Sequence, residues 1–184
     1  MFPEGAVHQH PTVDMRYFKW GVSRLILESE PTPDVVPMFI DGNQHLMPED
    51  RKFLRILPRV GARIRIAFGE RLDGEERFGD LRQRWKGLVS RSRAARSTQG
   101  RSSGGLDGRA EVMGELADDL KYGEEAQEIR IEVARRIREE VLKLRKELRY
   151  PEPDATFSLA ETWANEPEKK KYKSRVDDAW VNQD

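Results

Sequence analysis

The mixture of apolar and polar positions in residues 17–30 predicts a helix of about three turns with one buried face. Pro31 and Pro33 follow directly and stop the run, because proline cannot continue a helix. We therefore expect this helix to begin near Tyr17 and to end near Ser29.

Two strands are predicted next, separated by a turn. The apolar run 35–40 carries Pro37, which favours a buried or edge strand with a special position in it. The Asp-Gly-Asn sequence at 41–43 is a turn signal. Along 63–68 large apolar side chains alternate with arginine or alanine, which predicts a half-buried strand. Its predicted apolar face consists of Ile64, Ile66 and Phe68.

A short amphipathic pattern and a basic stretch follow. Four apolar residues recur at spacings of three and four, which predicts a short helix. These residues are Phe78, Leu81, Trp85 and Leu88. The stretch 90–109 is rich in Arg, Ser and Gly and has no periodicity, so we expect a poorly ordered insertion there.

The longest regular pattern lies in the C-terminal half. Apolar residues keep one helical stripe from Met113 to Leu148, with Gly123 as a candidate break and Pro151 as the end. We expect this amphipathic helix to pack on the domain, although the stripe also suits a coiled coil or a partner helix. The tail after Tyr150 has few aliphatic residues, which favours an extended or disordered segment.

These patterns divide the chain into four parts and indicate the class α/β. We expect strands and one helix in 1–70, a short helix and a basic low-complexity insertion in 71–110, an amphipathic helix in 111–150 and a disordered tail in 151–184. The mean hydropathy is -0.78 and charged residues make up 36% of the 184 residues, so the predicted core is small.

The charge balance limits the choice of partners. The chain has 33 basic and 33 acidic residues, and this zero net charge argues against a nucleic-acid-binding protein. Between residues 71 and 109, ten basic residues face five acidic ones, a local excess that could contact anionic lipid. The Ser- and Gly-rich background of this stretch favours a solvated linker.

The absence of cysteine excludes disulfides, a thiolate nucleophile and a Cys-containing zinc site. His8 and His10 could bind a metal weakly, but loop histidines are the simpler interpretation, and we expect no metal and no cofactor. No stretch approaches the roughly 18 consecutive apolar residues of a transmembrane helix. Contact with a membrane would therefore occur at its surface or through a segment outside this sequence.

Phe2-Pro3-Glu4-Gly5 is the motif that most directly suggests a binding function. A glycine at this position lets the backbone turn tightly and bring N–H groups near an anion, and a glutamate can orient a neighbouring basic group. The simpler alternative is an ordinary turn between a strand and a helix.

A second block, Phe18-Lys19-Trp20-Gly21 with Arg24-Leu25-Ile26, and a third, Val36-Pro37-Met38, follow the motif in order. This succession resembles the glycerolipid acyltransferase superfamily, and the second block narrows the resemblance to the tafazzins. The resemblance implies that Phe2, Pro3, Glu4 and Gly5 lie beside the phosphate of a glycerolipid substrate. It implies the C-terminal part of an acyltransferase fold, with a long C-terminal amphipathic helix.

The resemblance also suggests further site residues. Lys19, Trp20, Gly21 and Arg24 could form a basic and aromatic face for lipid headgroups, or they could simply pack the helix. Val36 and Pro37 match a block that shapes the acyl-binding wall in the superfamily. Ala6 stands where tafazzins often carry a cation, and alanine cannot pair with phosphate.

The family's chemistry rests on a His-x4-Asp pair that precedes the phosphate motif, and nothing precedes Met1 in this sequence. His45 and Asp50 have the correct spacing, but they follow the motif and enclose Pro48, so we reject them as the catalytic pair. We therefore assign no catalytic residue and expect the 184-residue chain to be inactive by itself.

By resemblance, the complete enzyme would transfer acyl groups between phospholipids and lysophospholipids, as tafazzins do when they remodel cardiolipin at mitochondrial membranes. This predicts a peripheral mitochondrial membrane protein. Two alternatives remain open at this stage. One is a non-catalytic module that binds anionic lipid surfaces, and the other is a helical interaction protein that uses the long stripe.

Overall fold

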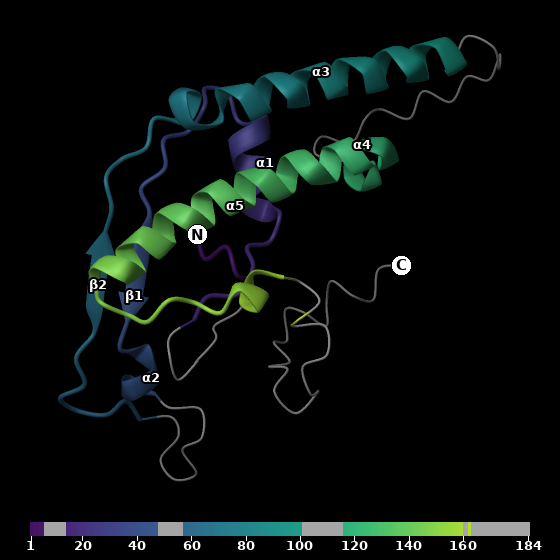
Figure 1. The fold of residues 1–184 in the computed structure, drawn as a ribbon. Coiled ribbons are helices and arrows are strands. Elements are labelled where there is room, and N and C mark those ends of the chain that lie inside the picture. Colours follow the sequence, from purple (N-terminus) through teal and green to yellow (C-terminus); the bar gives the residue numbers. More distant parts are fainter. Residues whose placement is uncertain (6–13, 48–56, 101–115, 160–161, 163–184) are drawn as a thin grey trace.

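The structure is a computed structural model that describes residues 1–5, 14–47, 57–100, 116–159 and 162. Within these ranges the fold is mixed α/β, as predicted, with a two-stranded antiparallel ribbon and several helices (Figure 1). Helices α3 (Gly74–Gly100) and α5 (Glu124–Glu147) contact each other, and α1 (Gly21–Glu28) packs against both. The ribbon lies near the C-terminal end of α5 (Figure 1).

Helix α1 begins later than the sequence pattern predicts, at Gly21 rather than near Tyr17. The residues before it are held by the N-terminal motif, because the Lys19 N–H donates to the Pro3 carbonyl at 2.8 Å. A backbone N–H that is used in this way is not available to a preceding helical turn. The helix ends at Glu28, shortly before the two prolines, as predicted.

Strands β1 (Met38–Asp41) and β2 (Arg65–Phe68) form the antiparallel ribbon, and their register pairs Met38 with Phe68. Strand β2 falls inside the predicted run 63–68, whereas β1 overlaps the predicted run 35–40 and extends to Asp41, where the predicted turn begins. Phe39 and Asp41 lie on the face that packs on α5, and each is only 5% exposed. Successive side chains of a strand alternate between faces, so Met38 and Ile40 lie on the opposite face.

The predicted buried face of the second strand was wrong. Ile64, Ile66 and Phe68 are 45%, 53% and 65% exposed. The register explains this result, since it places Arg65 opposite Asp41 on the side of α5 and leaves the three apolar residues on the other side. Alternation along the strand was present in the sequence, but the partner strand determined which half of the pattern faces the core.

Helix α3 is longer than expected, because it continues past Leu88 to Gly100 through part of the predicted insertion. Its beginning is capped by Asp73, whose carboxylate accepts hydrogen bonds from the N–H groups of Glu75 and Glu76 at 2.9 and 3.0 Å. The extension is rich in Arg and Ala, which favour helix, and contains no proline. Composition alone did not separate a basic helix from a basic linker. Residues 101–110 of the predicted insertion lie outside the described residues.

The C-terminal stripe is divided at Gly123, as the sequence suggested. The short helix α4 (Asp118–Tyr122) ends there, and α5 begins at Glu124. Gly123 has an extended backbone, and a side chain at this position would collide with the Asp119 carbonyl. The beginning of the predicted stripe, residues 113–115, lies outside the described residues.

Helix α5 ends with a residue in the left-handed conformation. Arg149 has a φ of 62°, the Tyr150 N–H donates to the Arg145 carbonyl at 3.3 Å, and the Arg149 N–H donates to the Lys146 carbonyl at 2.9 Å. These bonds satisfy carbonyls that have no partner within the helix. They also turn the chain toward Pro151, the residue at which we expected the helix to stop.

The core is a mixture of apolar side chains and buried arginines. Phe78, Ile129 and Val133 are fully buried where α3 and α5 meet. Arg82, which is 2% exposed, donates to the carbonyls of Ile26 and Ser29 and thereby satisfies the C-terminus of α1. In a chain of such low hydropathy, the long stems of buried arginines supply apolar volume while their guanidinium groups bond to carbonyls.

Two short helices complete the described fold. Helix α2 (Asn43–Leu46) follows β1, and the 3-10 helix η1 (Ala155–Ser158) is capped by the Asp154 side chain, which accepts from Thr156. Across the described ranges no helix is both long enough and apolar enough to cross a membrane. Of the predicted tail, residues 160–161 and 163–184 lie outside the described residues.

Candidate functional site

Phe2-Pro3-Glu4-Gly5 forms a tight turn. The Gly5 N–H donates to the Phe2 carbonyl at 3.2 Å, and Gly5 has a φ of +68°. Residues with a Cβ adopt this left-handed conformation at a cost, which explains why the motif ends on glycine.

The side chain of Lys19 lies against this glycine. A Cβ at Gly5 would come within 2.6 Å of the Lys19 Cδ and 2.9 Å of its Nζ, closer than atoms can approach without movement. The backbone bond from Lys19 to Pro3 holds the two segments in this arrangement. Lys19 is exposed, and within the described residues no carboxylate pairs with its ammonium. The structure therefore places an accessible cation beside the turn.

Glu4 points toward the segment that leads into α1. Its Oε2 accepts a hydrogen bond from the Arg16 N–H at 3.2 Å. Burial raises the pKa of the Glu4 carboxyl above its ordinary value, an effect only partly offset by that hydrogen bond and by the charges of Arg16 and Arg138. The partly buried glutamate thus anchors the turn to the protein.

Arg138 of α5 is the residue of this site that the sequence did not reveal. Its guanidinium donates to the carbonyls of Met15 at 2.8 Å and Arg16 at 3.2 Å. Burial lowers the pKa of Arg138, and the charges of Glu4 and Asp14 oppose that shift. In the sequence Arg138 is one of many charged residues on a helix, so no signal distinguished it from a solvated side chain.

Asp14 forms a second link between this segment and α5. Its Oδ1 lies 2.6 Å from Arg145 Nη2, and the two side chains are 7% and 2% exposed. Arg145 also donates to the Pro151 carbonyl. Two arginines of α5 therefore hold the segment that joins the motif to α1.

The Trp20 ring packs against an arginine side chain instead of projecting freely into solvent. The Arg130 guanidinium carbon lies 4.3 Å from the centre of the Trp20 ring and 5.9 Å from that of Trp85. Arg130 is 3% exposed, whereas Trp20 is 37% exposed. This cation–π contact lets Trp20 fasten the beginning of α1 to α5.

The other two residues of the predicted headgroup face have local structural roles. Gly21 is the first residue of α1. Arg24 donates two hydrogen bonds to the Glu28 carboxylate, at 2.8 and 2.9 Å, one helical turn away. Of the four residues predicted for this face, Lys19 is the one that the structure brings to the motif.

Val36 and Pro37, predicted for the acyl-binding wall, lie at the beginning of the ribbon. Val36 is 53% exposed. Pro37 is buried, its carbonyl accepts from the Gly69 N–H at 2.9 Å, and a Cβ at Gly69 would approach its ring. No contact between either residue and the motif is described, so their role in an acyl site stays a prediction.

The histidines do not form a described site. His45 is exposed in α2, whereas His8, His10 and Asp50 lie outside the described residues, as does Ala6. Among the residues that the structure covers, no three His, Cys, Asp or Glu side chains are grouped so as to hold a metal ion.

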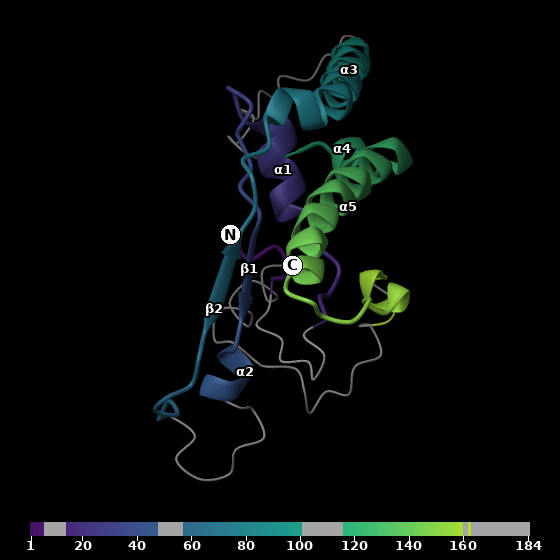
Figure 2. The ribbon, with the colours of Figure 1, turned by 60° about the vertical axis from the view of Figure 1, so that its left-hand side comes forward.

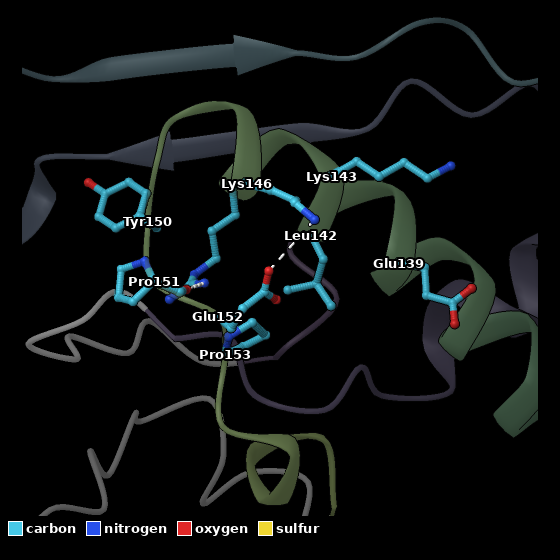
Figure 3. Close-up of a pocket in the computed structure, with 9 residues that line it drawn as sticks. Glu139, Leu142, Lys143, Lys146, Tyr150, Pro151, Glu152 and Pro153 are labelled. Atoms are coloured by element: carbon cyan, nitrogen blue, oxygen red, sulfur yellow. Dashed lines mark hydrogen bonds and ion pairs between the residues drawn. The ribbon is translucent and has the colours of Figure 1, made fainter.

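A pocket of about 310 Å³ lies at the C-terminal end of α5 (Figure 3). Both of its lysines already have carboxylate partners. Lys143 Nζ lies 2.6 Å from Glu140 Oε2, and Lys146 Nζ lies 3.7 Å from Glu152 Oε1. The residues that line it do not include Phe2–Gly5 or Lys19. The pocket is therefore a weaker candidate for an anion site than the turn beside Lys19.

The group beside the turn that suits an anion is the accessible Lys19 ammonium, because an ammonium can donate to a phosphate oxygen. The Gly5 N–H is already donated to the Phe2 carbonyl. Nothing in the described site resembles a general base beside a nucleophile.

Comparison with known proteins places the chain in a family. It is 34% identical over 171 residues to tafazzin of Saccharomyces cerevisiae, a match that covers 89% of this chain and 41% of that protein. It is 33% identical over 84 residues to tafazzin of Drosophila melanogaster, covering 46% of this chain and 21% of that one. The chain thus spans well under half the length of the tafazzins that it matches.

A third relative is N-acylphosphatidylethanolamine synthase of Arabidopsis thaliana, 35% identical over 74 residues that make up 39% of this chain and 26% of that protein. No protein-family model matches the sequence. The long match to yeast tafazzin agrees with the three motif blocks. The chain belongs to the tafazzin-like acyltransferase family.

Proposed function

We propose that this protein takes part in acyl transfer between phospholipids and lysophospholipids and that the turn at Gly5 recognises a lipid phosphate. The observation that carries the proposal is the position of Lys19, whose ammonium lies against the glycine of the motif. The names of two tafazzins and of a synthase of an acylated phospholipid support the same substrate class.

The physical basis of the recognition is a charge-assisted hydrogen bond. An ammonium that donates to a phosphate oxygen contributes about 1.5–3 kcal/mol, and an exposed site lies at the low end of that range. Phosphate is shared by all glycerophospholipids, so this contact would select the class and not the headgroup.

The finer proposal follows from the tafazzin resemblance. The chain would correspond to the C-terminal part of a glycerolipid acyltransferase fold, and the complete enzyme would remodel cardiolipin and associate peripherally with mitochondrial membranes. The match to yeast tafazzin supports this assignment. Val36 and Pro37 are proposed to contribute to the acyl site in the complete enzyme.

A titration with soluble dihexanoylphosphatidylcholine tests the phosphate site. We expect the backbone amide resonance of Gly5 to shift on binding and Lys19→Gln to weaken the affinity by about tenfold, because one charge-assisted contact is lost. Lys146→Gln, in the pocket at the end of α5, is the matched control and should bind normally. Loss of binding in the Lys146 variant but not in the Lys19 variant would move the site to the pocket.

We also propose that these 184 residues alone do not transfer acyl groups, because their single His-x4-Asp spacing, His45 to Asp50, follows the motif. The assay is transfer from labelled phosphatidylcholine to lysocardiolipin by the purified chain. We expect no transfer above background. Transfer that persists after His45→Ala would show that other residues catalyse it and would refute the proposal.

Non-catalytic binding of anionic lipid surfaces is a second candidate, favoured by the exposed Lys19 beside a formed turn. Flotation with vesicles that contain or lack cardiolipin tests it. Binding that requires cardiolipin and Lys19, without any transfer, would support this module.

A further inference from the structure

One face of helix α3 presents cationic and hydroxyl side chains to solvent. We call this face the α3 stripe, and it consists of Lys86, Ser90, Arg93 and Ser97. The four residues follow one another at spacings of four, three and four, which places them on one side of a helix. All four are exposed. Figure 2 shows α3 at the margin of the described fold, with α1 and α5 on the same side of it, as in Figure 1.

The flank of α3 that faces α5 is also basic, but its charges are paired. Arg84 Nη2 lies 3.8 Å from Glu128 Oε2, and Arg91 Nη2 lies 2.6 Å from Glu125 Oε2. Both glutamates belong to α5. This flank therefore presents charges of both signs, and it does not form a cationic surface.

The α3 stripe keeps a net positive charge. Residues 81–100 contain six basic side chains and no acidic one. Within the described residues, no carboxylate pairs with Arg93. Lys86 Nζ lies 2.7 Å from Glu30 Oε1, but these side chains are 59% and 64% exposed, and an exposed pair of this kind is weak. Both cations of the stripe are thus available to another anion.

The chemistry of the stripe suits a layer of anionic lipid headgroups. The hydroxyls of Ser90 and Ser97 donate to carbonyls of their own helix, so the two cations provide the attraction. The stripe contains no apolar side chain, so it would rest on headgroups without entering the hydrocarbon. Each cation near an anionic membrane raises the affinity about fivefold. Two cations therefore orient a protein on a membrane and do not anchor it.

We propose that the α3 stripe lies on an anionic phospholipid surface and orients the protein there. The choice of lipid over other anions rests on the substrate class proposed above, whereas the position of the contact rests on α3. A nucleic-acid duplex fits less well, because the net charge of the chain is zero and two cations release few counterions. The stripe is separate from the Gly5–Lys19 turn, although α1, which follows Lys19 closely, packs against α3.

Vesicle co-sedimentation of the 184-residue chain tests the proposal. The vesicles consist of phosphatidylcholine alone or of phosphatidylcholine mixed with phosphatidylglycerol, which supplies negative charge without the headgroup of cardiolipin. At an ionic strength of about 0.1 M, where the screening length is about 10 Å, we expect binding that requires phosphatidylglycerol. At about 1 M the binding should be lost, because the screening length falls to about 3 Å.

Two double variants compare the two sides of α3. Lys86→Gln/Arg93→Gln removes both cations of the stripe and should lower the vesicle affinity at least about tenfold at about 0.1 M salt. Arg84→Gln/Arg91→Gln removes the same charge from the flank that faces α5 and should lower the affinity by less than about threefold, because that flank lies about one screening length from the stripe. Glutamine keeps the helix propensity in both variants.

A second pair of variants adds charge to α3. Ser97→Glu introduces a carboxylate into the stripe and should lower the vesicle affinity about fivefold, because the carboxylate is repelled by anionic lipid. Thr98→Glu is the control, since Thr98 lies seven residues after Arg91 and therefore on the flank that faces α5. It should bind like the unmodified chain. Ser97 and Thr98 are both exposed, so this pair still tests the stripe if the Lys86/Arg93 variant folds poorly.

The titration with dihexanoylphosphatidylcholine separates the α3 stripe from the phosphate turn. This lipid dissolves as single molecules and offers no charged surface, so Lys86→Gln/Arg93→Gln should bind it like the unmodified chain. Normal binding of the soluble lipid without binding of the vesicles would refute the stripe and leave the turn in place. The reverse result would refute the turn and leave the stripe in place.

Three other results would overturn the proposal. The first is an equal loss of vesicle affinity in the two double variants. The second is binding that persists without phosphatidylglycerol and at about 1 M salt, which would indicate apolar insertion. The third is binding of a short DNA duplex that depends on Lys86 and Arg93 in a chain that does not bind the vesicles, which would assign the stripe to nucleic acid.

Discussion

Arg145 Nη2 lies 2.6 Å from Asp14 Oδ1, and this ion pair joins residues that are 131 positions apart in the sequence. Both side chains are almost completely buried. The pair therefore connects the C-terminal end of α5 to the segment between the N-terminal motif and α1. The position of the candidate site depends on this long-range contact as well as on the motif itself.

Replacing Arg145 by methionine should lower the free energy of unfolding by about 3–5 kcal/mol, because the buried Asp14 carboxylate would lose the guanidinium that lies 2.6 Å from it. Chemical denaturation measures the change. Lys146→Met, on the neighbouring side chain that is 79% exposed, is the control and should change stability by less than about 0.5 kcal/mol. Equal stability of the two variants would show that the ion pair is dispensable.

Gly5→Ala and Gly21→Ala form a second matched pair. Alanine at Gly5 must adopt a φ of +68° and meet the Lys19 side chain, so we expect a loss of about 1 kcal/mol and weaker phospholipid binding. Gly21 has open space around it in the first turn of α1, where alanine should be neutral or stabilising by up to about 1 kcal/mol. Thermal unfolding and the dihexanoylphosphatidylcholine titration measure both effects. The same result for both glycines would contradict the left-handed backbone conformation of Gly5.

Truncation of the two phenylalanines of the ribbon should change the free energy of unfolding by very different amounts. Phe39 is 5% exposed and its ring centre lies 5.9 Å from that of Tyr150, so Phe39→Ala should cost about 3–5 kcal/mol. Phe68 is 65% exposed, and Phe68→Ala should change the stability of this chain by less than about 0.5 kcal/mol. Urea denaturation distinguishes the two. A large loss of stability with Phe68→Ala would mean that the Phe68 side chain is covered within this chain.

Glu4 should make stability fall with rising pH over a limited window. Burial raises the pKa of its carboxyl above the ordinary value of 4.5, so between that value and the raised pKa the folded state binds more protons than the unfolded state. The free energy of unfolding therefore decreases as the pH rises through this window. Above the window, the destabilisation caused by the buried, ionised Glu4 carboxylate is fully present. Glu4→Gln should remove this contribution.

The measurement is denaturation at pH values from about 4 to about 8. Glu4→Gln should match the unmodified chain at the acidic end and be more stable at the neutral end. Glu147→Gln, at an exposed position near the end of α5, is the control and should follow the unmodified chain throughout. A difference of opposite sign would mean that Glu4 is stabilised as a carboxylate.

The sequence by itself determined those features that depend on neighbouring residues. Proline stops α1, Gly123 separates α4 from α5, and Phe2-Pro3-Glu4-Gly5 with Phe18-Lys19-Trp20-Gly21 identifies the family. Each of these signals acts within a few residues, because backbone geometry and helix termination are local.

The tertiary structure alone decided which side chains meet. Register turned Ile66 and Phe68 outward and Arg65 toward α5, contrary to the prediction, because alternation along a strand shows two faces without saying which one is covered. Likewise, Arg138 reaches the segment beside Glu4 only because α5 packs across it. Contacts between residues more than a hundred positions apart are set by packing, and no local pattern encodes them.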